Sequence, residues 1–408
     1  MFRRSRLAGF TLLAVCRCAF GQEWTEQSIL ELFDRQSPMR REARAAVVST
    51  VEAIRGRTLW PNPTAGYARE TVGFNEFVQA EQQLPLSGRL GLQRKAMDPA
   101  RDSMEAQGAA RLWDARSSLR TAFYRALAAQ EQARVFQSAL TEIQPIIELL
   151  RVREREGEGS RYDRMRVERE AAELRADLAL AQARERSERA VLLAYLPLET
   201  PLQMGAARLS GDLGARIIPR SREELIERAL GSRAEIRTEA SRLTQLSFEQ
   251  QAADRLRRPE PFLTAGLKRA DTGGNRTDTG AVIGISIPLP IFNKGQTEVA
   301  RISAERERTQ ARRDLLVQQI TAGVLGIYDV HAVRVAALQA FDRETGDSGA
   351  ELLTIARAGY RDGELGILQL LDAYRLARLT SLRRVDLQAA VKEAEIELSR
   401  NAGFEVMQ

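Results

Sequence analysis

Residues 77–89 read FVQAEQQLPLSGR, and residues 281–296 read AVIGISIPLPIFNKGQ. Both stretches begin with an alternation of apolar and polar residues, which is typical of a β-strand with one apolar face. In both, prolines end the strand pattern, and a glycine then precedes a long helical pattern. The chain is therefore expected to form the same strand-to-helix junction twice. The residues that mark the two junctions are Pro85, Gly88, Pro288, Pro290 and Gly295.

The composition of the 408-residue chain favours long helices over compact globular domains, because 28% of the residues are charged and only 6% are aromatic. There is one histidine, His331, and the two cysteines, Cys16 and Cys18, lie near the N-terminus. A His/Cys metal site in the body of the chain is thus unexpected, and His331 is expected to pack or to lie on a helix surface. No paired acids, Ser/His/Asp set or phosphate-binding loop is recognisable, so the sequence predicts neither an enzyme nor a cofactor.

Residues 1–21 have the pattern of an export signal, in which arginines precede an apolar stretch and Ala19-Phe20-Gly21 fits a cleavage site. A lipoprotein signal is the alternative, because Leu13-Ala14-Val15-Cys16 resembles a lipobox. Removing four arginines with this segment lowers the net charge from +6 to about +2, which does not indicate nucleic-acid binding. Farther along, no uninterrupted apolar run approaches 18 residues, which argues against a transmembrane helix.

The second half of the sequence repeats the first at a nearly constant offset. The clearest pairs are residues 61–63 with 259–261, Gly88 with Gly295, and Gly157 with Gly363, at offsets of 198, 207 and 206 residues. Each repeat is expected to contain a helix, a hairpin of strands, a long helix and a return helix, and the first repeat ends in an irregular linker. The predicted division is a signal peptide at 1–21, a first repeat at 22–222 and a second repeat at 223–408.

The expected strands cover 64–70, 77–84, 263–268 and 281–289, with a solvated loop tip at 271–278. The expected long helices cover 89–156 and 295–358, and the return helices cover 160–196 and 364–401. At about 1.5 Å per residue, each long helix would approach roughly 100 Å, which no globular domain matches in thickness.

Four strands with an apolar face suit a lipid bilayer, but four strands cannot close a barrel, and open sheet edges are not tolerated in lipid. Two copies would give eight strands with almost no lumen, whereas three copies would give twelve strands around a channel. The sequence therefore predicts a homotrimer that contacts membrane lipid.

The order of these elements resembles the TolC-like outer-membrane efflux protein family. The resemblance spans essentially the whole chain after residue 21, and it rests on residues 61–63, the two junctions and the segments 359–363 and 370–373. It implies a mainly α-helical fold with a small β part. In such a fold, long antiparallel helices form a periplasmic α-barrel, and four strands per chain join a twelve-stranded trimeric β-barrel in the outer membrane.

The family resemblance also implies a function, since its members are exit ducts of tripartite efflux pumps and of type I secretion. Passive export across the outer membrane is expected, with a periplasmic adaptor protein and an inner-membrane pump of the resistance-nodulation-division type as partners. The segment from Glu81 to Arg89 looks most like the heavy-metal cation efflux branch, and drug or solvent efflux is the close alternative. A soluble periplasmic coiled-coil scaffold would explain the helices, but not the two apolar-faced hairpins.

In relatives, an acid of a Leu-Asp-Ala segment faces the lumen near the periplasmic constriction, and Asp372 matches this acid. Gln369 stands where relatives often have a second acid, and Asp163 holds the same register in the first repeat. These three residues are the gate candidates, because a ring of carboxylates attracts cations, although both acids could equally be solvated helix residues. The residues expected to contact the adaptor at the tip are Gly157, Tyr360, Arg361, Asp362 and Gly363.

Overall fold

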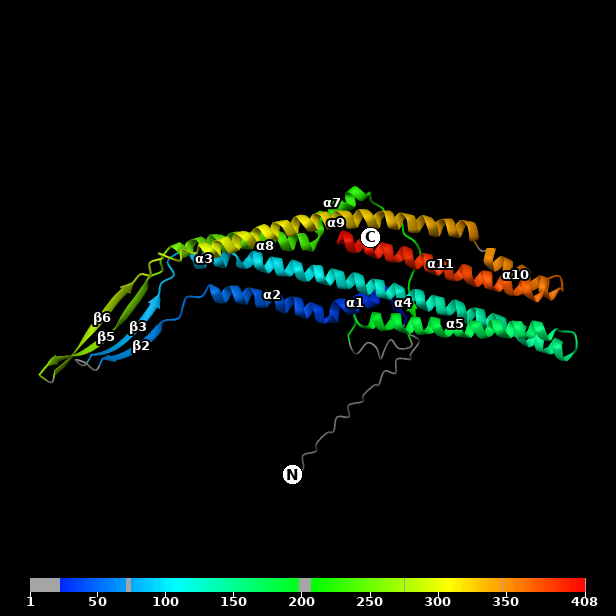
Figure 1. The fold of residues 1–408 in the computed structure, drawn as a ribbon, viewed down its shortest axis with the longest axis horizontal. Helices are drawn as coiled ribbons and strands as arrows, with labels where there is room; N and C mark the ends of the chain where they lie inside the picture. Colours follow the sequence, from blue (N-terminus) through cyan, green and yellow to red (C-terminus); the bar gives the residue numbers. More distant parts are fainter. Residues whose placement is uncertain (1–22, 71–74, 198–206, 275, 347, 408) are drawn as a thin grey trace, which may run out of the picture.

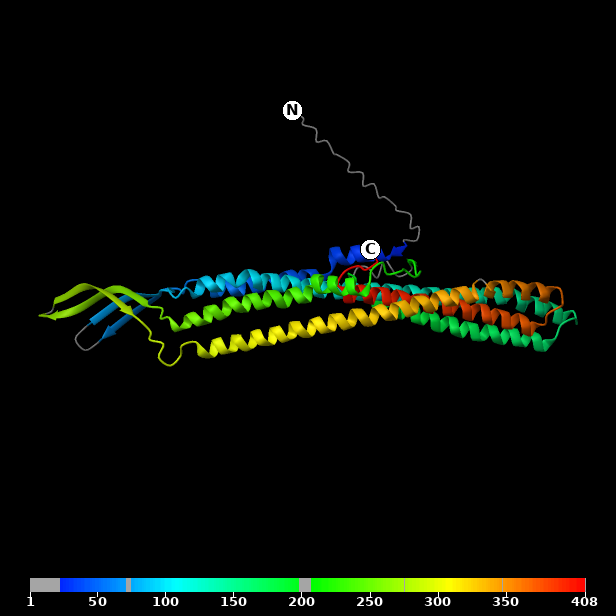
Figure 2. The ribbon, with the colours of Figure 1, turned by 90° about the horizontal axis from the view of Figure 1, so that it is seen from above.

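The computed structural model describes residues 23–407 except 71–74, 198–206, 275 and 347. The molecule is elongated, with a small sheet at one end, two helical hairpins at the other, and the C-terminus near mid-length (Figures 1 and 2). The predicted signal peptide and the lipobox around Cys16 lie outside the described residues.

The predicted fold class is confirmed, because the chain is mainly helical with long antiparallel helices and one four-stranded sheet. The helices are α1 (Glu26–Gln36), α2 (Pro38–Arg57), α3 (Arg89–Lys95), α4 (Met97–Arg155), α5 (Arg161–Leu193), α7 (Arg222–Ser232), α8 (Ala234–Asp254), the 3₁₀ helix η1 (Arg255–Arg257), α9 (Gln296–Thr345), α10 (Ser348–Arg361) and α11 (Ile367–Ala402). The strands are β1 (Trp24–Thr25), β2 (Thr64–Glu70), β3 (Asn75–Gln83), β4 (Leu209–Ser210), β5 (Phe262–Gly273) and β6 (Arg276–Ser286).

The sheet has the antiparallel order β2-β3-β5-β6, so β2 and β6 are its edges. In its register, Tyr67 lies opposite Val78, Val78 opposite Leu267, and Leu263 opposite Ile285, which brings the apolar positions of all four strands onto one face. This face is open to the surroundings, since Ile283 is 79% exposed. The other face carries polar side chains, among them Gln79, Glu81, Thr264 and Lys268.

The prediction of a loop at 271–278 is wrong, because both strands continue through most of it. Pairing of β5 with β6 extends to Asp271 opposite Thr277 and Gly273 opposite Arg276. Gly273 and Gly274 adopt φ angles of 90° and 65°, which L side chains rarely adopt, and they permit a much tighter turn than expected.

The prediction of an uninterrupted second long helix over 295–358 is also wrong. Helix α9 ends at Thr345, Gly346 has a φ of 46°, and α10 begins at Ser348. Arg384 of α11 stabilises this break, because it forms an ion pair of 2.9 Å with Asp342 and donates a hydrogen bond of 3.1 Å to the Gly346 carbonyl. The first long helix is divided only at Ala96, and it continues through Pro145.

One helical stretch among the described residues, Gln296–Arg361, contains a window with a mean hydropathy of 1.3, so by length and composition it could cross a membrane. The sequence-based expectation counted only uninterrupted apolar runs and did not identify it. The stretch consists of α9 and α10, which pack against α8 and α11, and only 17% of its most apolar window is buried in one copy of the chain.

The middle of the molecule is held by a core that the sequence did not predict. Strand β1 pairs in parallel with β4, so the linker after α5 returns to the start of the described chain. Phe33 and Phe123 are buried in the same apolar cluster as this strand pair. Arg120 forms ion pairs with both Glu26 and Glu405. These contacts join the N-terminal helix, α4 and the C-terminal segment.

Candidate functional site: the helical tip and the strand-to-helix junctions

The tip consists of two helical hairpins, α4–α5 and α10–α11, whose turns have the same backbone geometry. Gly157 and Gly363 have φ angles of 78° and 80°. The amide of Glu158 donates to the carbonyl of Arg153 at 2.9 Å, and the amide of Glu364 donates to that of Gly359 at 2.8 Å. Both are the six-to-one bonds of a Schellman C-cap, for which glycine is favoured.

The side chains around the two turns nevertheless differ. A Cβ on Gly159 would lie 2.9 Å from the Cβ of Arg153, whereas a Cβ on Gly359 would lie 2.9 Å from the side chain of Leu365. The glycine is thus Gly159, just before α5, in the first turn, and Gly359, in α10, in the second turn. Each turn therefore requires glycine at one of two equivalent positions, and the required position differs between the two turns.

The two hairpins pack on each other through an apolar core. Its buried members come from all four tip helices. They are Ile143, Ile147, Leu150, Val167, Ala171, Leu174, Ala356, Ile367, Leu370 and Leu371.

Tyr360 lies half-buried at the edge of this core, with the guanidinium of Arg153 5.8 Å from its ring centre. Burial raises the pKa of the Tyr360 hydroxyl, Arg153 opposes this shift, and Asp163 adds to it. The predicted residues Tyr360 and Asp163 therefore lie in one electrostatic environment, although they come from different repeats.

An ion cluster around one buried carboxylate, which we call the tip ion cluster, links the two hairpins. It consists of Glu170 of α5 with Arg375 and Arg378 of α11. The Glu170 side chain is 6% exposed and accepts hydrogen bonds from Arg375, while Arg378 lies 3.5 Å away. Burial alone would raise the pKa of Glu170, but the two arginines outweigh it and hold the pKa below its usual range. The sequence did not single out this acid, because it lies in a densely charged run that reads as a solvated helix face.

A second polar contact connects three helices near the tip. Arg357 of α10 donates 2.6 Å to Glu142 of α4 and 2.8 Å to the hydroxyl of Tyr374 on α11. Its guanidinium also lies 5.0 Å from the centre of the Tyr374 ring. Burial raises the pKa of Tyr374, whereas Arg357 lowers it.

The three gate candidates lie on two helices of the tip. Asp372 and Gln369 are exposed and lie three residues apart on α11, whereas Asp163 is half-buried on α5. The ion pair with Glu170 raises the pKa of Arg375, and the charge of Asp372 adds to this effect. Arg361 and Asp362 are exposed at the end of the second hairpin.

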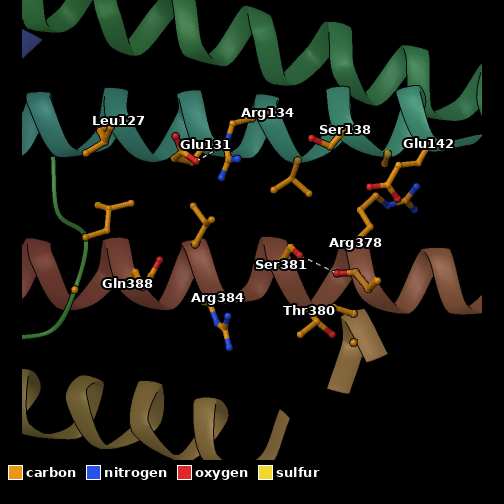
Figure 3. A pocket seen from close by; sticks show the side chains of 18 of the residues that line it. Leu127, Glu131, Arg134, Ser138, Glu142, Arg378, Thr380, Ser381, Arg384 and Gln388 are labelled. Carbon is orange, nitrogen blue, oxygen red and sulfur yellow. Dashed lines mark hydrogen bonds and ion pairs between the residues drawn. The ribbon is translucent and has the colours of Figure 1, made fainter. Parts of the chain in front are cut away.

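A groove of about 740 Å³ lies between the tip and the middle of the molecule (Figure 3). It is lined by α4, α11 and the start of α10, and segment 208–214 borders it. Its lining mixes charged residues, such as Glu131, Arg134 and Arg384, with small ones, such as Gly349 and Ala377. In the described parts of the chain, no three His, Cys, Asp or Glu residues are grouped as metal ligands. His331 is buried at 2% exposure on α9, which agrees with a packing role.

At the opposite end, both predicted junctions begin a helix with a left-handed glycine, Gly88 at a φ of 78° and Gly295 at 82°. A Cβ on Gly295 would lie 2.7 Å from the Cβ of Leu256, so the second junction also requires glycine for packing. Pro85, Pro288 and Pro290 follow the ends of β3 and β6, where the sheet ladder stops.

The fold of the chain is shared with solved outer-membrane proteins. The solved structure of VceC, an outer membrane protein of Vibrio cholerae, has a TM-score of 0.72 at 16% identity and covers 93% of this chain and 96% of VceC. The outer-membrane channel OprN has a TM-score of 0.73 at 16% identity and covers 94% of this chain and 91% of OprN.

In sequence, the chain is 24% identical over 407 residues to the cobalt-zinc-cadmium resistance protein CzcC of Cupriavidus metallidurans, which covers 94% of this chain and 95% of CzcC. No family model matches the chain. In fold and in sequence, the chain is thus similar to TolC-like outer-membrane efflux channels.

Proposed function

We propose that the chain is the outer-membrane channel of a tripartite efflux pump and that substrates leave through it passively. The observation that carries this proposal is the amphipathic four-stranded sheet with two open edges at the end of a long helical bundle. The apolar face would lie against lipid, and pairing of β6 with β2 of the next copy would remove the edges. Three copies would then give twelve strands around a lumen.

Channels of this family form trimers in tripartite efflux systems. For this chain we infer a periplasmic adaptor that docks at the two hairpin turns, where Gly157, Arg361 and Asp362 are exposed. An inner-membrane pump of the resistance-nodulation-division type would supply the energy. The units 22–222 and 223–408 would each provide one hairpin, so a trimer would present six hairpins to the adaptor.

The substrate that we favour is a heavy-metal cation, because the relative CzcC is a cobalt-zinc-cadmium resistance protein. Such a cation would pass the exposed carboxylate of Asp372 rather than stay bound, since the described residues contain no metal-ligand group. Export of drugs is the alternative. Deletion of the gene should sensitise cells to cobalt, zinc or cadmium, and sensitivity to drugs alone would favour the alternative.

The membrane assignment can be tested with two substitutions on neighbouring strands. Ile283 lies on the apolar face of β6, whereas Thr264 lies on the polar face of β5. A lysine on the lipid face of a membrane barrel costs about 2–4 kcal/mol near the bilayer midplane. Ile283→Lys should therefore deplete the protein from outer-membrane fractions, whereas Thr264→Lys should not. Recovery of the unaltered protein in the soluble periplasm would refute the proposal and favour a scaffold.

A further inference from the structure

Four segments meet where the sheet joins the helices, and together we call them the junction collar: residues 55–63, 86–95, 255–258 and 287–294. Arg94 donates 3.2 Å to the carbonyl of Thr58, which joins the first two segments. Gly295, which follows the fourth segment directly, lies so close to Leu256 of the third that a Cβ on it would be 2.7 Å from the Cβ of Leu256. The amide of Leu84 donates 2.8 Å to the carbonyl of Pro261, which connects the repeats at the same level.

The collar exposes large apolar side chains. Phe292 is 92% exposed and Trp60 is 57% exposed. The apolar face of the sheet leads directly into them, because Ile283, Ile285 and Ile287 are also exposed along the strand that ends at the collar. The remaining exposed apolar residues of the collar are Leu59, Leu86, Leu256, Leu289 and Ile291.

The charged residues within the four collar segments all have the same sign. Its four segments contain nine basic residues and no acid, although the whole chain has 61 basic and 55 acidic residues. The nine are Arg55, Arg57, Arg89, Arg94, Lys95, Arg255, Arg257, Arg258 and Lys294.

Two of the acids that flank the collar are already engaged, and a third, Glu298, forms an ion pair with Arg301 while its charge also acts on Arg57. Glu52 pairs with Arg55, and Glu260 accepts hydrogen bonds from Ser87 and from Gln83 at 3.1 Å. Glu260 also lies 3.8 Å from Arg89. Most of the positive charge of the collar is therefore not neutralised by these three acids.

One part of the collar forms a hollow of about 360 Å³, lined by Arg57, Trp60 and Arg89 and, on one side, by the carboxylate of Glu260 that is engaged with Arg89. An exposed indole beside guanidinium groups matches the chemistry at a membrane surface, where the ring lies at the headgroup level and the cations meet phosphate. A soluble anionic protein would complement the charge, but it would leave Phe292 and the other apolar side chains of the collar in water.

We propose that the junction collar binds the phosphate groups of anionic phospholipids in the leaflet that faces the helices. The inference rests on the proposed membrane function, because only a sheet inserted in a bilayer brings the collar to the headgroups. Lipid binding would fix the depth at which the sheet sits and would anchor the helices perpendicular to the membrane.

The test uses the full-length protein in nanodiscs that contain equal amounts of phosphatidylglycerol and phosphatidylcholine, followed by mass spectrometry of the lipids that remain bound in detergent. Phosphatidylglycerol should be enriched around the unaltered protein. The enrichment should fall on the order of 100-fold in Arg57→Gln/Arg257→Gln/Arg258→Gln, since three bases are removed and each base at an anionic surface contributes on the order of 1 kcal/mol. The matched control, Arg161→Gln/Arg175→Gln/Arg186→Gln, removes three exposed arginines from α5 and should leave the enrichment unchanged.

Two further measurements distinguish the alternatives. Added salt should weaken the enrichment around the unaltered protein, which supports the inference even if the triple variant misfolds. Competition by inorganic phosphate at matched ionic strength would show a site for free anions and overturn it. A changed ion selectivity of the channel in the triple variant, with normal lipid enrichment, would place the arginines in the lumen and also overturn it.

Failure of the inference is distinguishable from failure of the proposed function. Unaltered protein that inserts into the nanodiscs but shows no preference for phosphatidylglycerol overturns the collar inference alone. Unaltered protein that does not insert at all contradicts the proposed membrane channel.

Discussion

The substitution Glu170→Gln should allow the two hairpins of the tip to separate more easily, because it removes the negative charge of the tip ion cluster. Arg375 is 47% exposed, so water screens its ion pair, which contributes at most about 1 kcal/mol. Arg378 is only 16% exposed, and leaving its charge without a carboxylate costs about 1–3 kcal/mol. Together these terms favour separation by about 2 kcal/mol, which is roughly a 30-fold change in the equilibrium.

The assay is single-channel conductance of the protein in planar bilayers. With Glu170→Gln, the high-conductance state should become roughly 30-fold more populated relative to the low-conductance state. The matched control is Glu173→Gln on the same helix. Glu173 and its partner Arg169 are 58% and 83% exposed, so this change should stay within about 0.5 kcal/mol.

The pH dependence gives a second readout. The two arginines hold the pKa of Glu170 below its usual range, so the ionised cluster contributes stability above about pH 4.5, and this contribution is lost as the pH falls through the lowered pKa. At acidic pH the unaltered protein should therefore approach the behaviour of Glu170→Gln.

Unchanged conductance of Glu170→Gln, together with a lower unfolding temperature, would refute this reasoning, because the cluster would then stabilise the fold without affecting the channel. In Glu170→Gln/Arg378→Gln, both buried charges are gone, so part of the original equilibrium should return.

Gly295→Ala should destabilise the protein by about 1–3 kcal/mol, because Gly295 has a positive φ and an added Cβ would press against Leu256. Gly91→Ala should stabilise the protein by about 0.5–1 kcal/mol, because the space around Gly91 in helix α3 is open. Thermal unfolding measures both changes. Asp372→Asn should weaken the block of conductance by divalent cations, and an unchanged block would identify Asp372 as a solvated helix acid. Burial lowers the pKa of His331, while Glu395 raises it and Lys392 lowers it further. The stability associated with neutral His331 is thus present above about pH 6.5 and is lost as the pH falls. On acidification, the unfolding temperature of the unaltered protein should therefore fall more than that of His331→Leu.

The features that the sequence predicted well are set by local chemistry. The junctions at Gly88 and Gly295 could be predicted because prolines end the strand ladder and a left-handed residue requires glycine. The turns at Gly157 and Gly363 could be predicted because the duplication places the same C-cap signal at the same offset.

The features that the sequence did not predict depend on contacts between distant segments. Gly346 lies in a helical sequence pattern like that of Gly323 and Gly326, which stay helical. Unlike them, Gly346 follows the end of the helix, and its carbonyl accepts a hydrogen bond from Arg384 of α11. Glu170 has the sequence context of a surface acid, but in the fold its side chain is buried and forms ion pairs with Arg375 and Arg378 of α11. The roles of Asp372, Gln369 and Asp163 at a gate stay predictions, because a lumen forms only between copies of the chain.

The open edges of the sheet also have a kinetic consequence. A single copy that entered a bilayer would leave the outer backbone groups of β2 and β6 in hydrocarbon, and each unsatisfied group costs several kcal/mol. An inserted monomer is therefore too high in free energy to be a populated intermediate, and copies must meet before or while they enter the membrane. The rate of channel formation should consequently rise more steeply than in proportion to the concentration of newly exported chains, so small changes in expression would produce large changes in the number of channels.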